Sequence, residues 1–153
     1  MNLGLDDKVA LVCGASRGLG RAIADELAAE GSSLALCSRD EERLRVAASE
    51  LGPEVLAVPA DLAVAGEPTR VVEATLERFG RLDVLVTNTG GPPAGTHDTL
   101  TLADWDAATA LLLRSTVELA TAALPGMKER GWGRILAVTS VAVKQPVDNL
   151  ILS

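Results

Sequence analysis

The sequence predicts an α/β fold in which helices cover both faces of one doubly wound parallel sheet. Strand-like and helix-like segments alternate along all 153 residues, and this alternation is typical of parallel sheets with helical crossovers. The first apolar run, Val9–Cys13, is continuous rather than alternating, as in a strand that is buried on both faces. Three glycines follow it directly, at Gly14, Gly18 and Gly20, where a ligand-binding turn of such a sheet is expected.

Each expected strand in the first half of the chain is a short apolar run, and each expected helix carries apolar residues at helical spacing. In chain order we expect a strand at Val9–Cys13, a helix at Gly20–Glu30, a strand at Leu34–Cys37, a helix from Asp40 to Leu51, a strand at Val55–Val58 and a helix at Pro68–Phe79. Asp40 is placed to cap its helix, and Pro68 fits a first helical turn.

The second half continues the same alternation without a linker or an internal repeat. We expect a strand at Val84–Val86, a long helix from about Leu102 to Lys128, and a strand at Arg134–Val138. Right-handed crossovers then predict five strands in the order 3-2-1-4-5, within a single domain that spans residues 1–153.

Composition limits the classes of partner and location. The net charge is −7 and the Lys and Arg residues are scattered, which argues against a nucleic-acid partner. The first residues show no secretory signal and no apolar stretch is judged long enough for a membrane span, so we expect a cytoplasmic protein with no membrane partner. Cys13 and Cys37 lack metal-ligand spacing, so we expect buried apolar thiols and no metal site.

The string from Gly14 to Gly20 resembles the cofactor loop of the short-chain dehydrogenase/reductase family. Glycines there allow a tight turn and close approach to a pyrophosphate, whose charge is favoured by the N-terminus of the following helix. The G-x-x-x-G-x-G spacing departs from the generic dinucleotide fingerprint, and a glycine-rich turn without a ligand is the alternative. The resemblance implies a Rossmann-type NAD(P)-binding domain. Its implied loop contacts are Gly14, Ser16, Arg17, Gly18, Leu19 and Gly20.

The residues after the second expected strand favour NADP over NAD. A carboxylate about 20 residues after the glycine loop binds the ribose 2′-hydroxyl of NAD, whereas an arginine accommodates a 2′-phosphate. Ser38 stands at this acidic position, and Arg39 follows it. With Arg17 in the loop, two guanidinium groups are available for charge-assisted bonds to that phosphate. The alternative is that both are ordinary solvated arginines.

Two further strand ends match the family pattern. Asp61-Leu62 follows the third expected strand, where the resemblance implies that the carboxylate binds the adenine amino group; a helix cap is the alternative. Asn88 and Gly90 match the family's Asn-Asn-Ala-Gly motif, which implies a role in holding the sheet edge and the nicotinamide-side ribose. A simple strand-ending turn would also use Asn and Gly.

The catalytic residues of the family are only partly present. Ser140 matches the Ser whose hydroxyl binds the substrate carbonyl. Counting from the flanking residues places Leu112 where the family has an Asn of the proton relay. The family's Tyr-x-x-x-Lys motif should begin around residues 150–153, but the chain contains no Tyr. Protonation of the alkoxide therefore lacks its usual general acid, which contributes about 10²–10⁴-fold to rate.

These residues leave two functions open. The first is an NADP-dependent oxidoreductase that acts on a carbonyl or alcohol, with this chain as its cofactor-binding portion without the C-terminal part of the family fold. The second is a truncated or degenerate nucleotide-binding protein without hydride transfer. The substrate cannot be identified, because its pocket in this family comes largely from residues after the Tyr.

The long helix also bears on assembly. Its apolar residues between Leu111 and Leu124 cover more than one stripe, so one sheet cannot cover all of them. The resemblance implies a homodimer or homotetramer paired through this helix. The alternative is that these residues pack against a further segment of the family fold.

Overall fold

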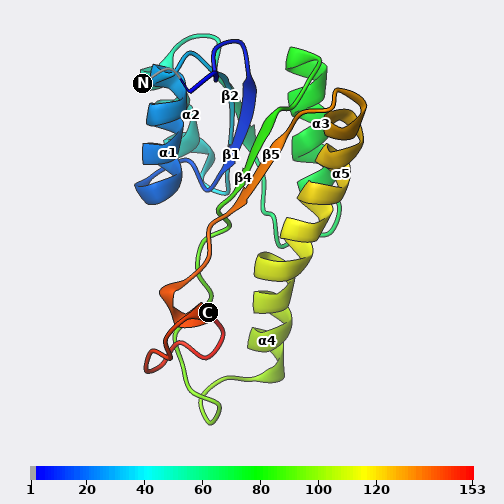
Figure 1. Cartoon of the computed structure of the whole chain (residues 1–153). Helices are drawn as coiled ribbons and strands as arrows, with labels where there is room; N and C mark the ends of the chain where they lie inside the picture. Colours follow the sequence, from blue (N-terminus) through cyan, green and yellow to red (C-terminus); the bar gives the residue numbers. More distant parts are fainter. Residues whose placement is uncertain (1–2) are drawn as a thin grey trace.

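The computed structural model describes residues 3–153, and its centre is a parallel sheet of five strands (Figure 1). The strands are β1 (Val9–Cys13), β2 (Ser33–Ser38), β3 (Leu56–Pro59), β4 (Val84–Thr87) and β5 (Arg134–Ala137). They lie in the order β3-β2-β1-β4-β5, and all neighbours are parallel. The α/β fold class and the strand order 3-2-1-4-5 predicted from the sequence are confirmed.

Helices cover both faces of this sheet. They are α1 (Gly18–Ala29), α2 (Glu41–Leu51), α3 (Glu67–Phe79), α4 (Leu102–Ala108) and α5 (Ser115–Glu129), with a π-helical segment η1 (Thr109–Arg114) and a short 3₁₀ turn η2 (Val141–Val143). Figure 1 shows α1 and α2 on one side of the sheet and α3 and α5 on the other.

Strand β1 explains why the sheet needs both layers. Its five residues are all buried, as the continuous apolar run predicts. Ala10 and Val12 belong to the core that includes Ala24 of α1 and Leu44 of α2. Leu11 and Cys13 belong to the opposite core. Successive strand residues point to opposite faces, so an alternating sequence would place polar groups in one core.

The long helix differs from the prediction of one regular element. It begins with a capping box, in which the Thr101 side chain accepts the Asp104 N–H and the Asp104 carboxylate accepts the Thr101 N–H. Its middle is π-helical, over Thr109–Arg114. The Ser115 hydroxyl donates to the Leu111 carbonyl, and the Thr116 hydroxyl donates to the Leu112 carbonyl at 2.8 Å. These side chains supply hydrogen bonds to carbonyls in the widened turn.

The expectation that no stretch is long enough for a membrane span is wrong by length and composition. Within residues 3–153, the continuous helix over Leu102–Glu129 has 28 residues, and an 18-residue window of it has a mean hydropathy of 1.3. Part of this apolar content packs inside the domain, because Leu119, Ala123 and Met127 belong to the core between α3 and the sheet. Packing of this kind is ordinary for a helix of an α/β layer.

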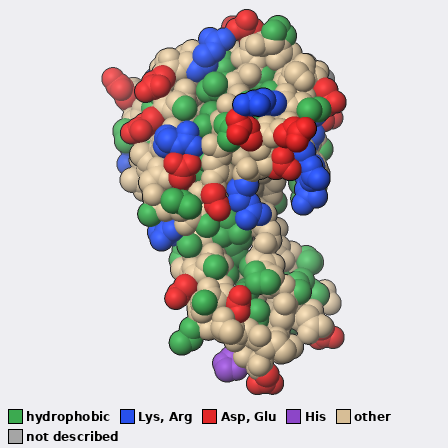
Figure 2. All heavy atoms as spheres, turned by 180° about the vertical axis from the view of Figure 1, so that it is seen from behind, with side chains coloured by type: hydrophobic (Ala, Val, Ile, Leu, Met, Phe, Trp, Pro, Cys, Tyr) green, Lys and Arg blue, Asp and Glu red, His purple; other side chains and the backbone are tan. Residues whose placement is uncertain are grey.

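The far edge of the sheet is poorly covered. All four residues of β5 are exposed, and the exposed fraction of Leu136 is 52%. Val141, Val143 and Ile151 beyond this strand are also exposed. Figure 2 shows charged side chains gathered over the sheet and its helices, and mainly hydrophobic and uncharged atoms over the part that contains α4 and the C-terminal segment. The described chain thus leaves an apolar surface beside β5.

The fully buried Asp83 ties three strands and a helix together. Its Oδ2 accepts the Val9 N–H at 3.0 Å, and its Oδ1 accepts a bond from Arg81 at 2.9 Å. Arg130, at the end of α5, lies 3.5 Å from the same carboxylate, and the Asp83 carbonyl accepts the Arg134 N–H of β5. Burial raises the pKa of Asp83, but the bonds from Arg81 and Val9 and the nearby positive charges outweigh burial. The net pKa is therefore below its ordinary value.

We expect Asp83→Asn to lower the free energy of unfolding at pH 7 by about 1–3 kcal/mol, because the arginines and Val9 lose a charged acceptor. The folded pKa is depressed, so this stabilisation is complete above the unfolded pKa of about 3.9 and is lost as the pH falls through the folded value. Urea unfolding at pH 7 and at about pH 3 checks this, and the difference between the variants should shrink at the lower pH. The exposed Asp98→Asn is the control. Equal effects of the two substitutions at pH 7 would contradict the role of Asp83.

Candidate functional site

A cavity of about 690 Å³ lies at the carboxyl ends of β1, β2 and β4. This edge is where a doubly wound sheet is expected to bind its ligand, and the volume falls within the usual range for such sites. The cavity brings together many of the site residues proposed from the sequence: Gly14, Ser16, Arg17, Gly18, Ser38, Arg39, Leu62, Asn88 and Gly90. Leu19, Gly20, Asp61 and Ser140 do not line it.

The glycine turn is shaped by a close approach of three backbone segments. A Cβ at Gly14 would lie 2.3 Å from the Asn88 carbonyl oxygen, and a Cβ at Gly20 would lie 2.3 Å from the Gly14 carbonyl oxygen. Gly14 also has a φ of +62°, which disfavours other residues. Gly20, although outside the lining, is therefore what allows α1 to begin against the loop.

The N-terminus of α1 suits an anionic ligand. Its first turn contains no acidic residue, and no side chain caps it. By contrast, α2 is capped by the Asp40 side chain, and α4 is closed by the Thr101–Asp104 capping box. Unpaired N–H groups and the positive end of the helix dipole therefore face the cavity only at α1 among these three helices. The residues present fit a pyrophosphate group at this place.

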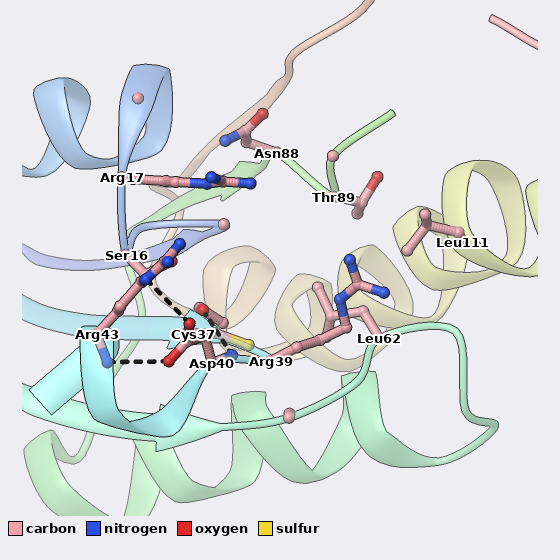
Figure 3. Close-up of a pocket in the computed structure, with 15 residues that line it drawn as sticks. Ser16, Arg17, Cys37, Arg39, Asp40, Arg43, Leu62, Asn88, Thr89 and Leu111 are labelled. Atoms are coloured by element: carbon pink, nitrogen blue, oxygen red, sulfur yellow. Dashed lines mark hydrogen bonds and ion pairs between the residues drawn. The ribbon is translucent and has the colours of Figure 1, made fainter. Parts of the chain in front are cut away.

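The arginines around the cavity differ from the expected pair. Figure 3 shows the Arg17 side chain extending across the cavity below Asn88, whereas the Arg39 side chain reaches toward Leu62. Arg43, which the sequence analysis missed, also lines the cavity from the first turn of α2. Its position three residues after the expected helix cap, Asp40, is the signal that could have found it.

Ser38 has a local structural role as well as a place in the lining. Its hydroxyl accepts the Asp40 N–H at 3.2 Å, which shapes the turn from β2 into α2. No acidic side chain stands at position 38 itself, and the carboxylate that lines the cavity beyond the end of β2 is that of Asp40, the cap of α2.

Of the neighbouring residues Asp61 and Leu62, only Leu62 lines the cavity. The Asp61 Oδ1 accepts the Ala63 N–H at 3.0 Å, which is the geometry of a turn. Leu62 is buried and lines the cavity. This arrangement gives the cavity an apolar wall beside β3, where a flat aromatic ring could pack.

Cys13 and Cys37 are paired across β1 and β2 in the sheet register, and both are fully buried. A hydrogen bond with Cys37 and burial raise the pKa of the Cys13 thiol well above its ordinary value. A thiol with a raised pKa is a poor nucleophile. The structure confirms that both cysteines are buried. Cys37 also forms part of the cavity wall (Figure 3).

Few of the residues that the family resemblance suggests for catalysis are present. Ser140 follows β5, and its hydroxyl accepts the Ala142 N–H at 3.1 Å as the cap of η2. The π-helical segment presents Leu111 to the cavity. Counting residues indicated Leu112 for the position of the missing Asn; in the structure the residue of this segment that lines the cavity is Leu111.

A second cavity of about 380 Å³ lies between the loop before α4 and the C-terminal segment. The Gly95 N–H donates to the Asn149 carbonyl at 2.6 Å, and this contact holds the two segments together. His97 lies in its lining. Across residues 3–153 the structure shows no group of three or more His, Cys, Asp or Glu side chains suited to a metal ion.

Comparison with known proteins agrees with this geometry. The family described as short chain dehydrogenase matches residues 8–152. A 1,6-dihydroxycyclohexa-2,4-diene-1-carboxylate dehydrogenase from Pseudomonas putida is 40% identical over 146 residues, which cover 94% of this chain and 54% of that protein.

Solved structures are similar over nearly the whole chain. An L-sorbose reductase from Gluconobacter frateurii, complexed with NADPH and L-sorbose, has a TM-score of 0.95 and 35% identity, and the match covers 99% of this chain and 59% of that one. A 3-ketoacyl-(acyl-carrier-protein) reductase from Brucella melitensis, complexed with NADH, has a TM-score of 0.90 and 31% identity, with 97% and 63% covered. The chain thus spans less than two thirds of the length of these relatives.

We expect Gly20→Ala to lower the free energy of unfolding by about 1–3 kcal/mol, because the added Cβ would overlap the Gly14 carbonyl. Gly91→Ala is the matched control, since a Cβ there meets nothing within 4 Å, and its effect should stay within about 0.5 kcal/mol. Chemical denaturation of both variants measures the difference. Equal stability of the two variants would show that the close approach does not constrain the turn.

Proposed function

This chain belongs to the short-chain dehydrogenase family, and we propose that it is the cofactor-binding portion of an oxidoreductase that transfers a hydride between NADP(H) and a carbonyl or alcohol substrate. The observation that carries the proposal is the cavity at the carboxyl ends of β1, β2 and β4. It combines a glycine turn with the uncapped N-terminus of α1. This combination suits the pyrophosphate of a dinucleotide.

The preference for NADP over NAD is supported by charge. Arg17 and Arg39 line the cavity, and Ser38 stands where an NAD-binding site would have a carboxylate. Among similar structures, the L-sorbose reductase is complexed with NADPH and the 3-ketoacyl-(acyl-carrier-protein) reductase with NADH. A nicotinamide dinucleotide is thus the common cofactor class, and the guanidinium groups are the reason to propose NADP here.

The chain's own residues would divide the work as follows. The main-chain N–H groups from Gly18 onward and the side chains of Arg17 and Asn88 hold and orient the cofactor, which supplies or accepts the hydride when bound. Leu62 and Leu111 give the cavity apolar walls that exclude water. Asp61 is proposed at the adenine side, and Gly90 and Asn88 at the nicotinamide-side ribose. The Ser140 hydroxyl, at the end of β5, is the group that would orient a substrate carbonyl.

The second candidate function is nucleotide binding without hydride transfer. It is favoured by a specific observation: the 153 residues contain no Tyr, and leucines occupy the helix where a relay amide is expected. A Ser hydroxyl has no pKa suited to protonating an alkoxide near neutral pH.

We therefore expect the 153 residues alone to oxidise NADPH with any carbonyl substrate at least about 10²-fold more slowly than an enzyme with a general acid. The assay follows NADPH absorbance with a panel of ketones and aldehydes, and the Ser140→Ala variant is the control. Fast turnover that disappears in this variant would show that another acid, or water, completes the chemistry and would remove the second candidate.

The remaining proposals concern partners and location. We propose a small-molecule carbonyl or alcohol as substrate, a cytoplasmic location, and no nucleic-acid or membrane partner. The net charge of −7 supports the exclusion of nucleic acid. The packing of Leu119, Ala123 and Met127 inside the domain supports a role for the long helix in the fold rather than in a bilayer.

We expect the chain to bind NADPH more tightly than NADH, and Arg17→Ala to weaken NADPH binding by about 1.5–3 kcal/mol while it leaves NADH binding much less affected. The reason is that only NADPH carries the 2′-phosphate. Isothermal titration of both cofactors against both proteins measures this. An equal loss for the two cofactors would mean that Arg17 contacts the shared pyrophosphate instead.

Assembly through the long helix is also proposed. Leu113, Val117 and Leu124 are exposed on a face that differs from the buried stripe of Ser115, Leu119, Ala123 and Met127. A second copy of the chain would bury this face in a homodimer, and repetition at another surface would give a homotetramer.

We expect Val117→Glu to shift a dimer toward monomer in light scattering at micromolar concentration, because it places a charge in the apolar contact. Val46→Glu is a matched control, since Val46 is 53% exposed and Val117 is 54% exposed, and Val46 lies on α2, on the opposite side of the sheet from α5. A wild-type protein that is monomeric, or equal dissociation by the two variants, would contradict the helix interface.

A further inference from the structure

Arg43 is a cation of the cavity that belongs neither to the glycine loop nor to the end of β2. It lies in the first turn of α2 and lines the main cavity. It also lines an adjoining groove of about 420 Å³ between α1 and α2, and Ser16 is the other residue shared by both hollows. Figure 3 shows the Arg43 guanidinium on the side of Ser16. The two residues therefore mark the passage between the cavity and the groove.

The partner of Arg43 is an acid at the mouth of the same cavity. The Asp40 Oδ1 accepts the Arg43 N–H at 3.0 Å, and the Arg43 Nε lies 3.2 Å from the Asp40 Oδ2. Asp40 also lines the cavity. A carboxylate at this position repels a phosphate group unless a cation neutralises it.

The other arginines are less suited to that task. Figure 3 shows Arg39 reaching toward Leu62, on the opposite side of Asp40 from Ser16. Arg21, in the adjoining groove, is held by Asp25 at 2.8 Å and by Glu50 at 2.7 Å. Of the cations around Ser16, Arg17 and Arg43 thus remain directed at the cavity.

We propose that Arg43 is a specificity-determining residue that neutralises Asp40 and contacts the 2′-phosphate of NADP(H) from the side of Ser16. This inference rests on the proposed function and assigns that function's cofactor preference to a residue of α2. In this arrangement the Asp40 carboxylate serves the helix as its cap, and its charge is screened from the phosphate by the Arg43 guanidinium. Removal of Arg43 then has two effects on a 2′-phosphate: a cation is lost, and an acid is uncovered.

The expected size of the effect is limited by solvent. The Arg43 side chain is 60% exposed, so its contact with a phosphate is screened and is weaker than that of a buried ion pair. We expect a loss of about tenfold in affinity for a ligand with a 2′-phosphate, and little change for one with a free 2′-hydroxyl.

The test uses two fragments that contain no nicotinamide, adenosine 2′,5′-bisphosphate and adenosine 5′-monophosphate, titrated into the full chain by calorimetry. Arg43→Ala should lower the affinity for the bisphosphate about tenfold and change the affinity for the monophosphate by less than about twofold. Arg45→Ala is the matched control: it removes the same charge from the same helix, pairs with Glu41 and lines no cavity described here. The affinities of Arg45→Ala for both ligands should be close to those of the wild type.

A second variant tests the role of the acid. Asp40→Asn keeps a residue that caps helices well, so α2 should form, and the loss of the negative charge should tighten bisphosphate binding. A lower affinity of Asp40→Asn for the monophosphate would overturn the proposal, because it would mean that Asp40 holds the 2′-hydroxyl.

The outcomes separate this inference from the function on which it rests. If the wild type binds the bisphosphate and Arg43→Ala behaves like Arg45→Ala, the inference is overturned while the proposed function stands. An equal loss of affinity for both ligands in Arg43→Ala also overturns the inference, because the effect is then not specific to the 2′-phosphate. If the wild type binds neither fragment nor NADPH, the proposed function and the inference both fail.

Discussion

The structure depends on one close approach, in which the turn after β1 and the start of α1 meet the end of β4. At Gly14 and Gly20 the neighbouring carbonyl oxygens leave no room for a Cβ. This contact brings Asn88 to the glycine turn and aims the N-terminus of α1 into the cavity. The approach of β4 to the uncapped N-terminus of α1 thus depends on the absence of side chains at Gly14 and Gly20.

The fold was predictable because it rests on local patterns that tolerate errors of one or two residues. Buried strands read as continuous apolar runs, and the glycine and proline positions mark the ends of helices. The strand order follows from crossover handedness once the alternation is recognised. Boundaries moved, as at β3, which begins at Leu56 rather than Val55, and the long helix contains a π-helical segment that was not predicted.

The parts of the site that the sequence analysis missed depend on geometry between elements. The apolar run around Leu111 does not mark the π-helical segment. The hydroxyls of Ser115 and Thr116, one turn later, donate hydrogen bonds to carbonyls within it. The direction of Arg39 and the presence of Arg43 in the lining depend on how α2 leaves β2. Nothing in the sequence singles out Asp83 either, although in the structure its carboxylate binds β1 and lies beside the end of α5.

Binding and chemistry are unevenly represented in this chain. The elements that hold a dinucleotide in such a fold are present and packed on both faces of β1. Ser140 is the one residue proposed for the substrate side; β5 before it is exposed, and the relatives are much longer. An exposed apolar sheet edge of this kind favours association with another protein segment.

The most direct test of the central claim is a map of amide chemical shifts in the full chain as NADPH is added. The account predicts saturable shifts that are largest from Gly14 to Gly20 and at Asn88 and Gly90, where the turn, the helix end and β4 meet. Shifts confined to the second cavity around Gly95 and Asn149, or no saturable shifts at all, would contradict it.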